Sequence, residues 1–235
     1  MRTVVTMHQP NYLPWIGLFS KIKQADYFVI MDTFQYTKHG ITHRNKVRTN
    51  AGSCYLTIPI GKEFAMVKIK DVELPSDRKW QDIHWQTIYH NYLKTDFFKY
   101  HADFFETLYQ KNFYFLWQIN VNIIRYLLKC FETNVEIIMA SDLKLSPDLK
   151  HTDMIIAVLK TIGATAYLSG PSGKGYLEVA KFQQNNLSCR FAKFTHPVYK
   201  QRYPGFEPNL AAIDLLFNVG PQSSEVIKES GGIED

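Results

Sequence analysis

The sequence predicts an α/β fold, a mostly parallel Rossmann-like sheet flanked by helices, with an inserted β-hairpin and a helical subdomain. Short β-branched and aromatic runs alternate with helical patterns near both ends of the chain, which is typical of strand–helix–strand units. Between residues 80 and 131 there is no glycine or proline, and aromatic residues recur at helical spacing. We therefore expect an α/β core that holds the site at 1–75 and 133–220, a helical insertion at 76–132 and a flexible tail at 221–235.

The composition is that of a globular protein with a substantial core. Of the 235 residues 46% are hydrophobic, and the formal net charge is +5, with acidic residues mixed among the basic ones. This mild charge argues against a dedicated polyanion-binding protein, so we expect no nucleic acid partner. Three widely spaced cysteines, and no signal-peptide core or long apolar span, predict a cytoplasmic location and no insertion into a membrane. The sequence leaves the oligomeric state open.

The first elements form a strand–helix–strand unit. A strand is expected at 3–7, a helix at 16–22 and a second strand at 27–31. A crossover of this kind joins parallel strands, so the residues that directly follow the two strands lie at one end of the sheet. His8 and Asp32 are those residues, and we expect them to share a site.

Turn and periodicity signals place the later elements. Residues 49–52 predict the turn of a β-hairpin between 45–48 and 54–60, and 66–74 alternates like a half-exposed strand. Residues 80–131 predict two or three packed helices. The α/β rhythm then resumes with a strand at 136–140, a helix at 153–161, a strand at 165–168, a helical pattern ending near 182 and a strand at 189–194.

A candidate site follows the first strand, in the stretch His8-Gln9-Pro10-Asn11-Tyr12-Leu13-Pro14-Trp15. The two prolines restrict the backbone and hold the neighbouring side chains in fixed directions. Ligands of open α/β sheets bind beyond the carboxyl ends of the strands. We therefore expect His8 to act in catalysis, Gln9 to contact the ligand, and Tyr12 and Trp15 to stack on it. The alternative is a structural corner in which His8 is hydrogen-bonded scaffold.

A polar and basic stretch at 32–45 lies beside that site in the predicted fold. His43 is a second candidate general base, because an imidazole titrates near neutral pH and Asp32 would orient it. Arg44 suits bidentate recognition of a carboxylate or phosphate. Asn45 and Gln35 supply amides for ligand contact. The other cations of this stretch are typical of a solvated hairpin edge.

A glycine-rich loop at 169–176 is the third candidate. Its glycines let main-chain N–H groups approach an anion, a helical pattern follows, and Lys174 adds a positive charge. The candidate contacts are Ser169, Gly170, Ser172, Gly173, Lys174 and Tyr176. The loop matches neither the Walker nor the dinucleotide signature, and the alternative is a tight strand-to-helix connection.

Three other features predict structure rather than chemistry. The helix start at 150–153 predicts that Thr152 or Asp153 caps the helix or complements its dipole. No histidine pair has the spacing of a metal site, so we expect no bound metal. The aromatic residues of 80–131 predict a helix core.

Several motifs occur together in one order. They are His8 to Trp15, Asp32, Gln35, Arg44-Asn45, Leu56-Thr57-Ile58-Pro59, Tyr167-Leu168-Ser169-Gly170-Pro171-Ser172-Gly173, Phe206-Glu207-Pro208-Asn209-Leu210 and Ile213 to Gly220. With these residues the chain resembles the WbqC-like protein family over nearly its whole length. One departure is at Lys150-His151-Thr152, where the resemblance implies a glycine-containing stretch.

The resemblance implies a role in the biosynthesis of bacterial O-antigen, lipopolysaccharide and other surface polysaccharides. It favours a transferase that moves an acyl or aminoacyl group onto an amino sugar of a nucleotide-linked sugar. The donor is then a coenzyme A ester or a carrier-bound group, and the residues themselves define no cofactor. Two alternatives stay open. One is a nucleotidylyltransferase-like enzyme that adenylylates its substrate and releases pyrophosphate, with His8 and Lys21 stabilising phosphate charge; the other is a non-catalytic sugar- or carrier-binding protein.

Overall fold

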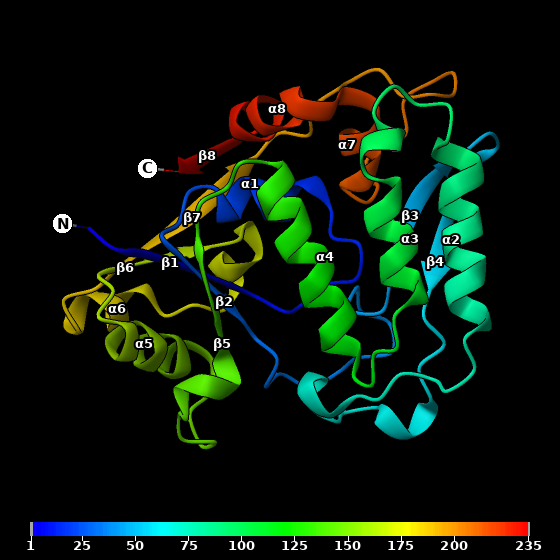
Figure 1. The fold of residues 1–235 in the computed structure, drawn as a ribbon. Coiled ribbons are helices and arrows are strands. Elements are labelled where there is room, and N and C mark those ends of the chain that lie inside the picture. The colour runs from blue at the N-terminus through cyan, green and yellow to red at the C-terminus, as the bar shows by residue number, and fades with distance from the viewer. Residues whose placement is uncertain (1, 235) are drawn as a thin grey trace.

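One six-stranded sheet forms the centre of the molecule. The structure, a computed structural model, describes residues 2–234 (Figure 1). The strand order is β5-β2-β1-β6-β7-β8, in which β8 is antiparallel to β7 and all other neighbours are parallel. The strands are β1 (Val4–His8), β2 (Tyr27–Ile30), β5 (Glu136–Met139), β6 (Ala166–Ser169), β7 (Ser188–Phe194) and β8 (Gly231–Glu234). The predicted α/β fold with a mostly parallel sheet is confirmed.

Helices cover both faces of this sheet (Figure 1). On one face lie α5 (His151–Ile162) and α6 (Val179–Gln184), and on the other lie α1 (Ile16–Ile22) and α4 (Leu116–Cys130). Two hydrophobic clusters separate accordingly, because successive side chains of a strand point to opposite faces. The first cluster includes Phe28, Ile30, Leu18, Ile22 and Ile119, and the second includes Val5, Met7, Val29, Ile155 and Phe182.

A hairpin and two helices pack beside the sheet, at the right of Figure 1. They are β3 (Arg44–Thr49), β4 (Gly52–Thr57), α2 (Lys79–Tyr92) and α3 (Ala102–Gln110). The predicted hairpin and the predicted packed helices are both confirmed. The hydrophobic cluster of the α1 face continues into this unit, so the helices share their core with the sheet.

The predicted strand at 66–74 is wrong. The chain there forms a 3-10 turn, Ile69–Asp71, and makes only isolated bridges to other segments. Ile69 and Val72 are buried, and their spacing of three residues puts them on one side of a turn rather than one face of a strand. The other 3-10 segments are Lys62–Phe64, Phe98–Tyr100, Ala140–Leu143, Pro171–Gly175 and Gly220–Gln222.

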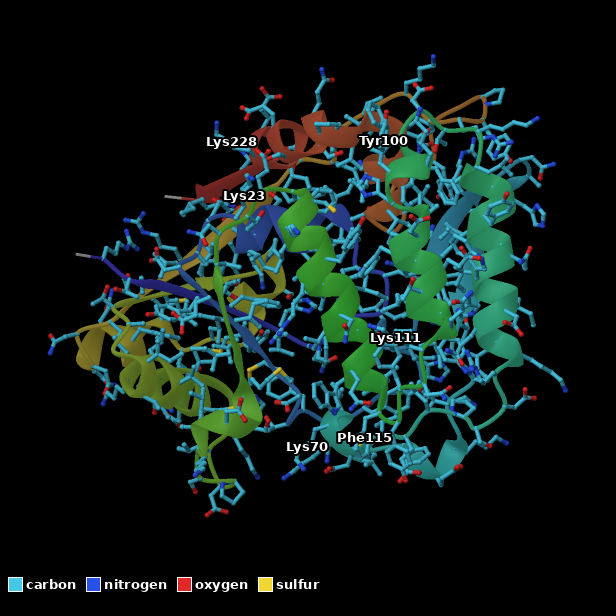
Figure 2. All side chains as sticks on the ribbon, viewed as in Figure 1. Lys23, Lys70, Tyr100, Lys111, Phe115 and Lys228 are labelled. Carbon is cyan, nitrogen blue, oxygen red and sulfur yellow. The ribbon has the colours of Figure 1, made fainter. Side chains whose placement is uncertain are left out.

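The predicted flexible tail at 221–235 forms regular structure in the residues described. After α7 (Ile213–Val219), α8 (Ser223–Glu229) packs near α1, and β8 becomes the last strand of the sheet. Lys23 fastens α8: its ammonium donates to the Phe131 carbonyl at 2.7 Å and to the Ser224 hydroxyl at 2.9 Å (Figure 2). The small, polar residues of this segment gave no sign of a strand, because the hydrogen bonds that hold β8 come from a distant strand, β7. Met1 and Asp235 lie outside the described residues.

Helix α4 ties the sheet to the hairpin unit through one buried side chain. The amide of Asn120, which is fully buried, donates to the Pro10 carbonyl at 2.8 Å and to the Thr42 carbonyl at 2.7 Å. One acceptor lies in the loop after β1, and the other lies just before β3. A single amide therefore holds two loops against one helix.

Replacing Asn120 with alanine is expected to lower the free energy of unfolding by about 2–4 kcal/mol, because two buried carbonyls lose their donor. Urea denaturation followed by circular dichroism measures the change. The matched control is Asn122→Ala, since that exposed amide donates only to the Gln118 carbonyl within α4. We expect the control to lose less than about 0.5 kcal/mol, and equal losses would contradict the role of Asn120.

Candidate functional site

The candidate site lies where the strand order of the sheet changes direction. From β1 the chain continues to β2 on one side, and it returns later to β6 on the other side. Such a switch point leaves a crevice at the carboxyl ends of the strands, which is the usual ligand site of open α/β sheets. His8 ends β1 and Ser169 ends β6, so the first and third sequence candidates meet there.

The loop after β1 is held by donors from other segments. Leu13 has a φ of 43°, a left-handed conformation that is uncommon outside glycine. The Asn45 amide donates to the Leu13 carbonyl at 2.6 Å, and the Ala212 N–H donates to the Pro14 carbonyl at 2.8 Å. Asn45, predicted to contact a ligand, therefore holds the loop instead.

The two aromatic residues of this loop pack inside the protein. Tyr12 is fully buried, and its hydroxyl bonds with Nδ1 of His84 at 2.8 Å and with the Tyr109 hydroxyl. It has no exposed face on which a ligand could stack. Trp15 is partly buried and meets the Phe194 ring edge-on at 5.0 Å. The predicted stacking at Tyr12 is corrected by this packing, since the ring belongs to the core.

A buried ammonium lies beside the candidate base. Lys21 is 7% exposed, and its Nζ donates to the Met7 carbonyl at 2.9 Å. No carboxylate within residues 2–234 forms an ion pair with it. Burial lowers the pKa of Lys21 to about 8. An uncompensated buried cation is costly, and an anionic ligand would compensate it.

His8 is neutral in this environment. Burial first, and then the positive charge of Lys21, lower the pKa of His8 from 6.5 to about 4. Its Nδ1 lies 3.0 Å from the Gln9 carbonyl oxygen and 3.4 Å from the Asn11 amide nitrogen; the shorter contact, to an atom that can only accept, favours the proton on Nδ1. The lone pair is therefore on Nε2. This tautomer leaves one nitrogen free to take a proton from a substrate.

Several buried polar atoms near the loop have no hydrogen-bond partner among the described residues. Asn120 joins the loop after β1 to the segment that leads into β3. The unpaired atoms lie in that loop, at the start of the hairpin, and on Asn120 itself. They are Asn11 Oδ1, Thr42 Oγ1, His43 Nδ1, Arg44 Nε and Asn120 Oδ1. Buried polar groups are normally paired, so each of these atoms lacks its usual partner in the described structure.

Two members of this group, His43 and Arg44, lie at the start of the hairpin. His43 is 5% exposed, and burial, followed by the charge of Arg44, lowers its pKa to about 4. The Arg44 guanidinium lies over the ring of Tyr55, 5.1 Å from its centroid, and donates weakly to the His39 carbonyl at 3.4 Å. In the part of the chain that is described, no carboxylate pairs with Arg44. Arg44 thus retains the capacity to bind an anion.

Asp32 makes a structural contact. It is 2% exposed, and its Oδ1 accepts the N–H of Ser141 at 3.0 Å, which joins the end of β2 to the turn after β5. No hydrogen bond links it to His8 or His43 within residues 2–234. The sequence prediction placed it at the correct sheet end but gave it a partner that it does not contact. Gln35 is exposed and bridges Lys68 through its backbone.

The glycine loop is packed on its inner side, at Ser169 and Gly173, and exposed on its outer side. Ser169 is 1% exposed, and a Cβ atom on Gly173 would collide with its Oγ. Lys174 pairs with Glu234 and is half-exposed, so its charge is partly compensated. Ser172, in the 3-10 turn, is exposed, Gly170, just before the turn, is partly buried, and Tyr176 is 54% exposed. Helix α6 begins only at Val179, so the loop does not lead directly into a helix N-terminus as predicted.

The start of α5 is not capped by a side chain. The Thr152 hydroxyl accepts the N–H of Glu178 at 3.1 Å, and Asp153 pairs with Lys181 at 3.0 Å, so the predicted capping is wrong. Asp153 does lie in the first turn of α5, where a negative charge complements the helix dipole. His151 has a φ of 46°. This is the left-handed region that favours glycine, at the position where the resemblance implied a glycine-containing stretch.

Asn11, Thr42 and Asn120 were missed by sequence reasoning. Asn11 lay inside the quoted motif but carried no specific signal. Asn120 had one: an amide among apolar residues at helical spacing lies at a core position and needs partners there. Over residues 2–234 no three His, Cys, Asp or Glu side chains gather as metal ligands. Among the described helices, none has both the length and the apolar character needed to cross a membrane.

Comparison with known proteins agrees with the motifs of this site. Residues 9–226 match the profile of the WbqC-like protein family. An uncharacterized protein of Mycobacterium tuberculosis, Rv1507c, is 30% identical to the chain over 229 residues, which is 95% of this chain and 97% of that protein. The matched region contains the loop after β1, the hairpin and the glycine loop. The chain therefore belongs to the WbqC-like protein family.

Proposed function

We propose that this protein is a transferase of bacterial O-antigen and related surface-polysaccharide biosynthesis, acting on a nucleotide-linked amino sugar. The observation that carries the proposal is the buried Lys21 ammonium beside a neutral His8, at the carboxyl ends of β1 and β6. The diphosphate of the substrate supplies the negative charge that would pair with the Lys21 ammonium. The sugar then lies against the unpaired polar atoms of Asn11, Thr42 and Asn120.

The transferred group is an acyl or aminoacyl group carried as a thioester of coenzyme A or of a carrier protein. The sugar amine attacks the thioester carbonyl carbon; the carbon–nitrogen bond forms and the carbon–sulfur bond breaks. His8 takes the proton that the amine loses, and the departing sulfur receives it. We expect these reactants in the cytoplasm, in keeping with three free thiols in the chain.

Substrate binding also prepares His8 for this step. With a pKa of about 4, His8 is neutral at pH 7 but a weak base. The diphosphate offsets the positive charge of Lys21, and that charge is one cause of the low pKa. The pKa of His8 therefore rises when the nucleotide sugar binds, which strengthens the base only in the complex.

Nucleotidyl transfer is the second candidate function. The Lys21 ammonium, which has no carboxylate partner among the described residues, favours it, because a cation near the end of the first strand also suits the charge that develops on a reacting phosphate. In this reaction a sugar phosphate oxygen attacks the α-phosphorus of a nucleoside triphosphate and pyrophosphate leaves. Release of pyrophosphate with magnesium present distinguishes it from acyl transfer.

The direct test incubates the purified protein with nucleotide-linked amino sugars and acyl-coenzyme A thioesters, and detects the product by mass spectrometry. We expect a thioester-dependent mass increase on the sugar, and a fall of about a hundredfold to ten-thousandfold in turnover for His8→Ala. His90→Ala, at an exposed position of α2, is the control and keeps full turnover. Sugar binding without any product, or pyrophosphate release alone, would contradict acyl transfer.

The electrostatic link between Lys21 and His8 gives a separate prediction. Lys21→Met is expected to raise the pKa of His8 above about 4, because the ammonium is removed while burial remains. Carbon-detected NMR of the imidazole rings measures the titration. Lys174→Met is the control and leaves the His8 pKa unchanged, since Lys174 pairs with Glu234.

The same titration has a consequence for stability. The pKa of His8 is lowered in the folded state, so its stabilising contribution is present above pH 6.5 and is lost as the pH falls toward 4.

An identical His8 titration in the wild type and in the Lys21→Met variant would show that the two groups do not interact.

The packing of the glycine loop gives a third prediction. Gly173→Ala is expected to displace Ser169 and to reduce turnover at least tenfold, because the new methyl group collides with the serine hydroxyl. Gly175→Ala is the matched control in the same turn, where nothing lies within 4 Å of an added Cβ. Steady-state kinetics measure the turnover of both variants. Equal turnover of the two variants would show that the packing of this loop does not affect catalysis.

A further inference from the structure

The positive charge of this protein is concentrated in one stretch of the chain. Residues 33–69 contain six of the 27 Lys and Arg but only one of the 22 Asp and Glu, so this stretch carries a formal charge of +5. The rest of the chain has equal numbers of both signs, and the whole chain is also +5. Of these six cations, the proposed chemistry uses only Arg44.

Two segments of this stretch pair side by side and present one outward face. Gln35 and Lys68 form an antiparallel bridge, and the Tyr36 N–H donates to the Val67 carbonyl at 2.7 Å. Side chains alternate between the two sides of such a pair. Tyr36 is accordingly buried, whereas Gln35, Met66 and Lys68 are exposed. Met66 and Lys68 therefore point outward together.

Basic side chains without acidic partners surround this face. The turn before β3 and the 3-10 turn Lys62–Phe64 contribute them next to the paired segments. Four basic residues are exposed and form no ion pair among residues 2–234, namely Lys38, His39, Lys62 and Lys68. Lys70, labelled in Figure 2, pairs with Asp71 at the border of this region. We call the four residues, together with Met66 and Ile41, the basic surface.

Two large apolar side chains stand among these basic ones. Met66 is 62% exposed and Ile41 is 46% exposed. Apolar side chains surrounded by charged ones are typical of protein interfaces, in which a polar rim encloses an apolar centre. A small anion needs a concave site that buries it, whereas these basic residues are spread over exposed turns. The basic surface therefore suits a protein partner with negative charge.

The basic surface borders the candidate site. The Ile41 carbonyl accepts the N–H of Tyr12, in the loop after β1, at 3.3 Å. The His39 carbonyl accepts from the Arg44 guanidinium at 3.4 Å. A partner bound to this surface thus lies beside the residues to which a substrate is brought.

We propose that the basic surface docks an acidic carrier protein, which delivers the acyl group as a thioester on its flexible arm. The inference rests on the proposed use of a thioester donor, and it selects the carrier protein over coenzyme A. Opposite charges attract and orient the carrier, and the exposed Met66 and Ile41 contact its apolar surface. Coenzyme A has no protein surface with which to cover the two turns.

Isothermal titration calorimetry with an acetyl-loaded acyl carrier protein, which is acidic, measures the docking. We expect the double variant Lys62→Glu/Lys68→Glu to bind about tenfold more weakly or worse, because attraction becomes repulsion. Wild-type affinity is also expected to fall when NaCl rises from about 50 mM to about 300 mM, since salt screens exposed charges. The matched control is Lys94→Glu/Lys200→Glu, which changes the net charge equally at exposed positions outside the basic surface and keeps wild-type affinity.

A second variant tests the apolar centre without changing any charge. Met66→Ser removes an exposed thioether side chain, and we expect it to weaken carrier binding while leaving the salt dependence as in the wild type. All variants alter exposed side chains, so circular dichroism is expected to show wild-type melting temperatures.

Equal affinity of the wild type and folded Lys62→Glu/Lys68→Glu, or no binding of the carrier protein to the wild type, would overturn the inference. Binding of the wild type to vesicles that contain phosphatidylglycerol, but not to the carrier protein, would assign the basic surface to an anionic membrane instead.

The docking is measured without turnover, so its outcome is distinguishable from failure of the proposed function. Carrier binding that depends on Lys62 and Lys68, without transferase activity, keeps the docking surface and removes the proposed reaction. Transferase activity in which the double variant leaves the KM for the acetyl carrier protein unchanged removes the docking surface and keeps the reaction. We expect a raised KM for the acetyl carrier protein and an unchanged KM for acetyl-coenzyme A.

Discussion

Prolines in the loop after β1 impose the constraint on which the arrangement of the site depends. Proline has no N–H, so two residues of this loop provide no backbone donor. The carbonyls of Pro10, Leu13 and Pro14 accept from donors on Asn120, Asn45 and Ala212. These donors come from α4, β3 and the segment before α7. The loop is therefore fixed only when the sheet, the hairpin and the helices are assembled together.

The electrostatics of the site follow from this assembly. Burial brings Lys21 next to His8 without a compensating carboxylate, and it keeps both His8 and His43 neutral near pH 7. Arg44 is likewise free of a carboxylate partner among the described residues. The free protein therefore holds two uncompensated cations near two neutral imidazoles. This combination favours an anionic ligand.

Local sequence patterns predicted the elements whose hydrogen bonds and burial are set locally. The β1–α1–β2 unit and the β3–β4 hairpin follow from periodicity and turn residues, and they placed His8 and Asp32 at one sheet end. Contacts between distant segments were not predictable in this way. Asp32 bonds with Ser141, Tyr12 with His84, and β8 with β7, and each partner is more than 30 residues away in sequence. The Asn120 bridge was missed for the same reason.

We propose that the Lys21 ammonium binds the anionic part of the substrate and that His8 faces the reacting amine. The crystal structure of the protein in complex with a nucleotide-linked amino sugar tests it most directly. We expect a diphosphate oxygen within hydrogen-bonding distance of the Lys21 ammonium, with the sugar amine facing Nε2 of His8. A nucleotide sugar bound elsewhere, with the Lys21 ammonium still donating only to the Met7 carbonyl, would contradict it.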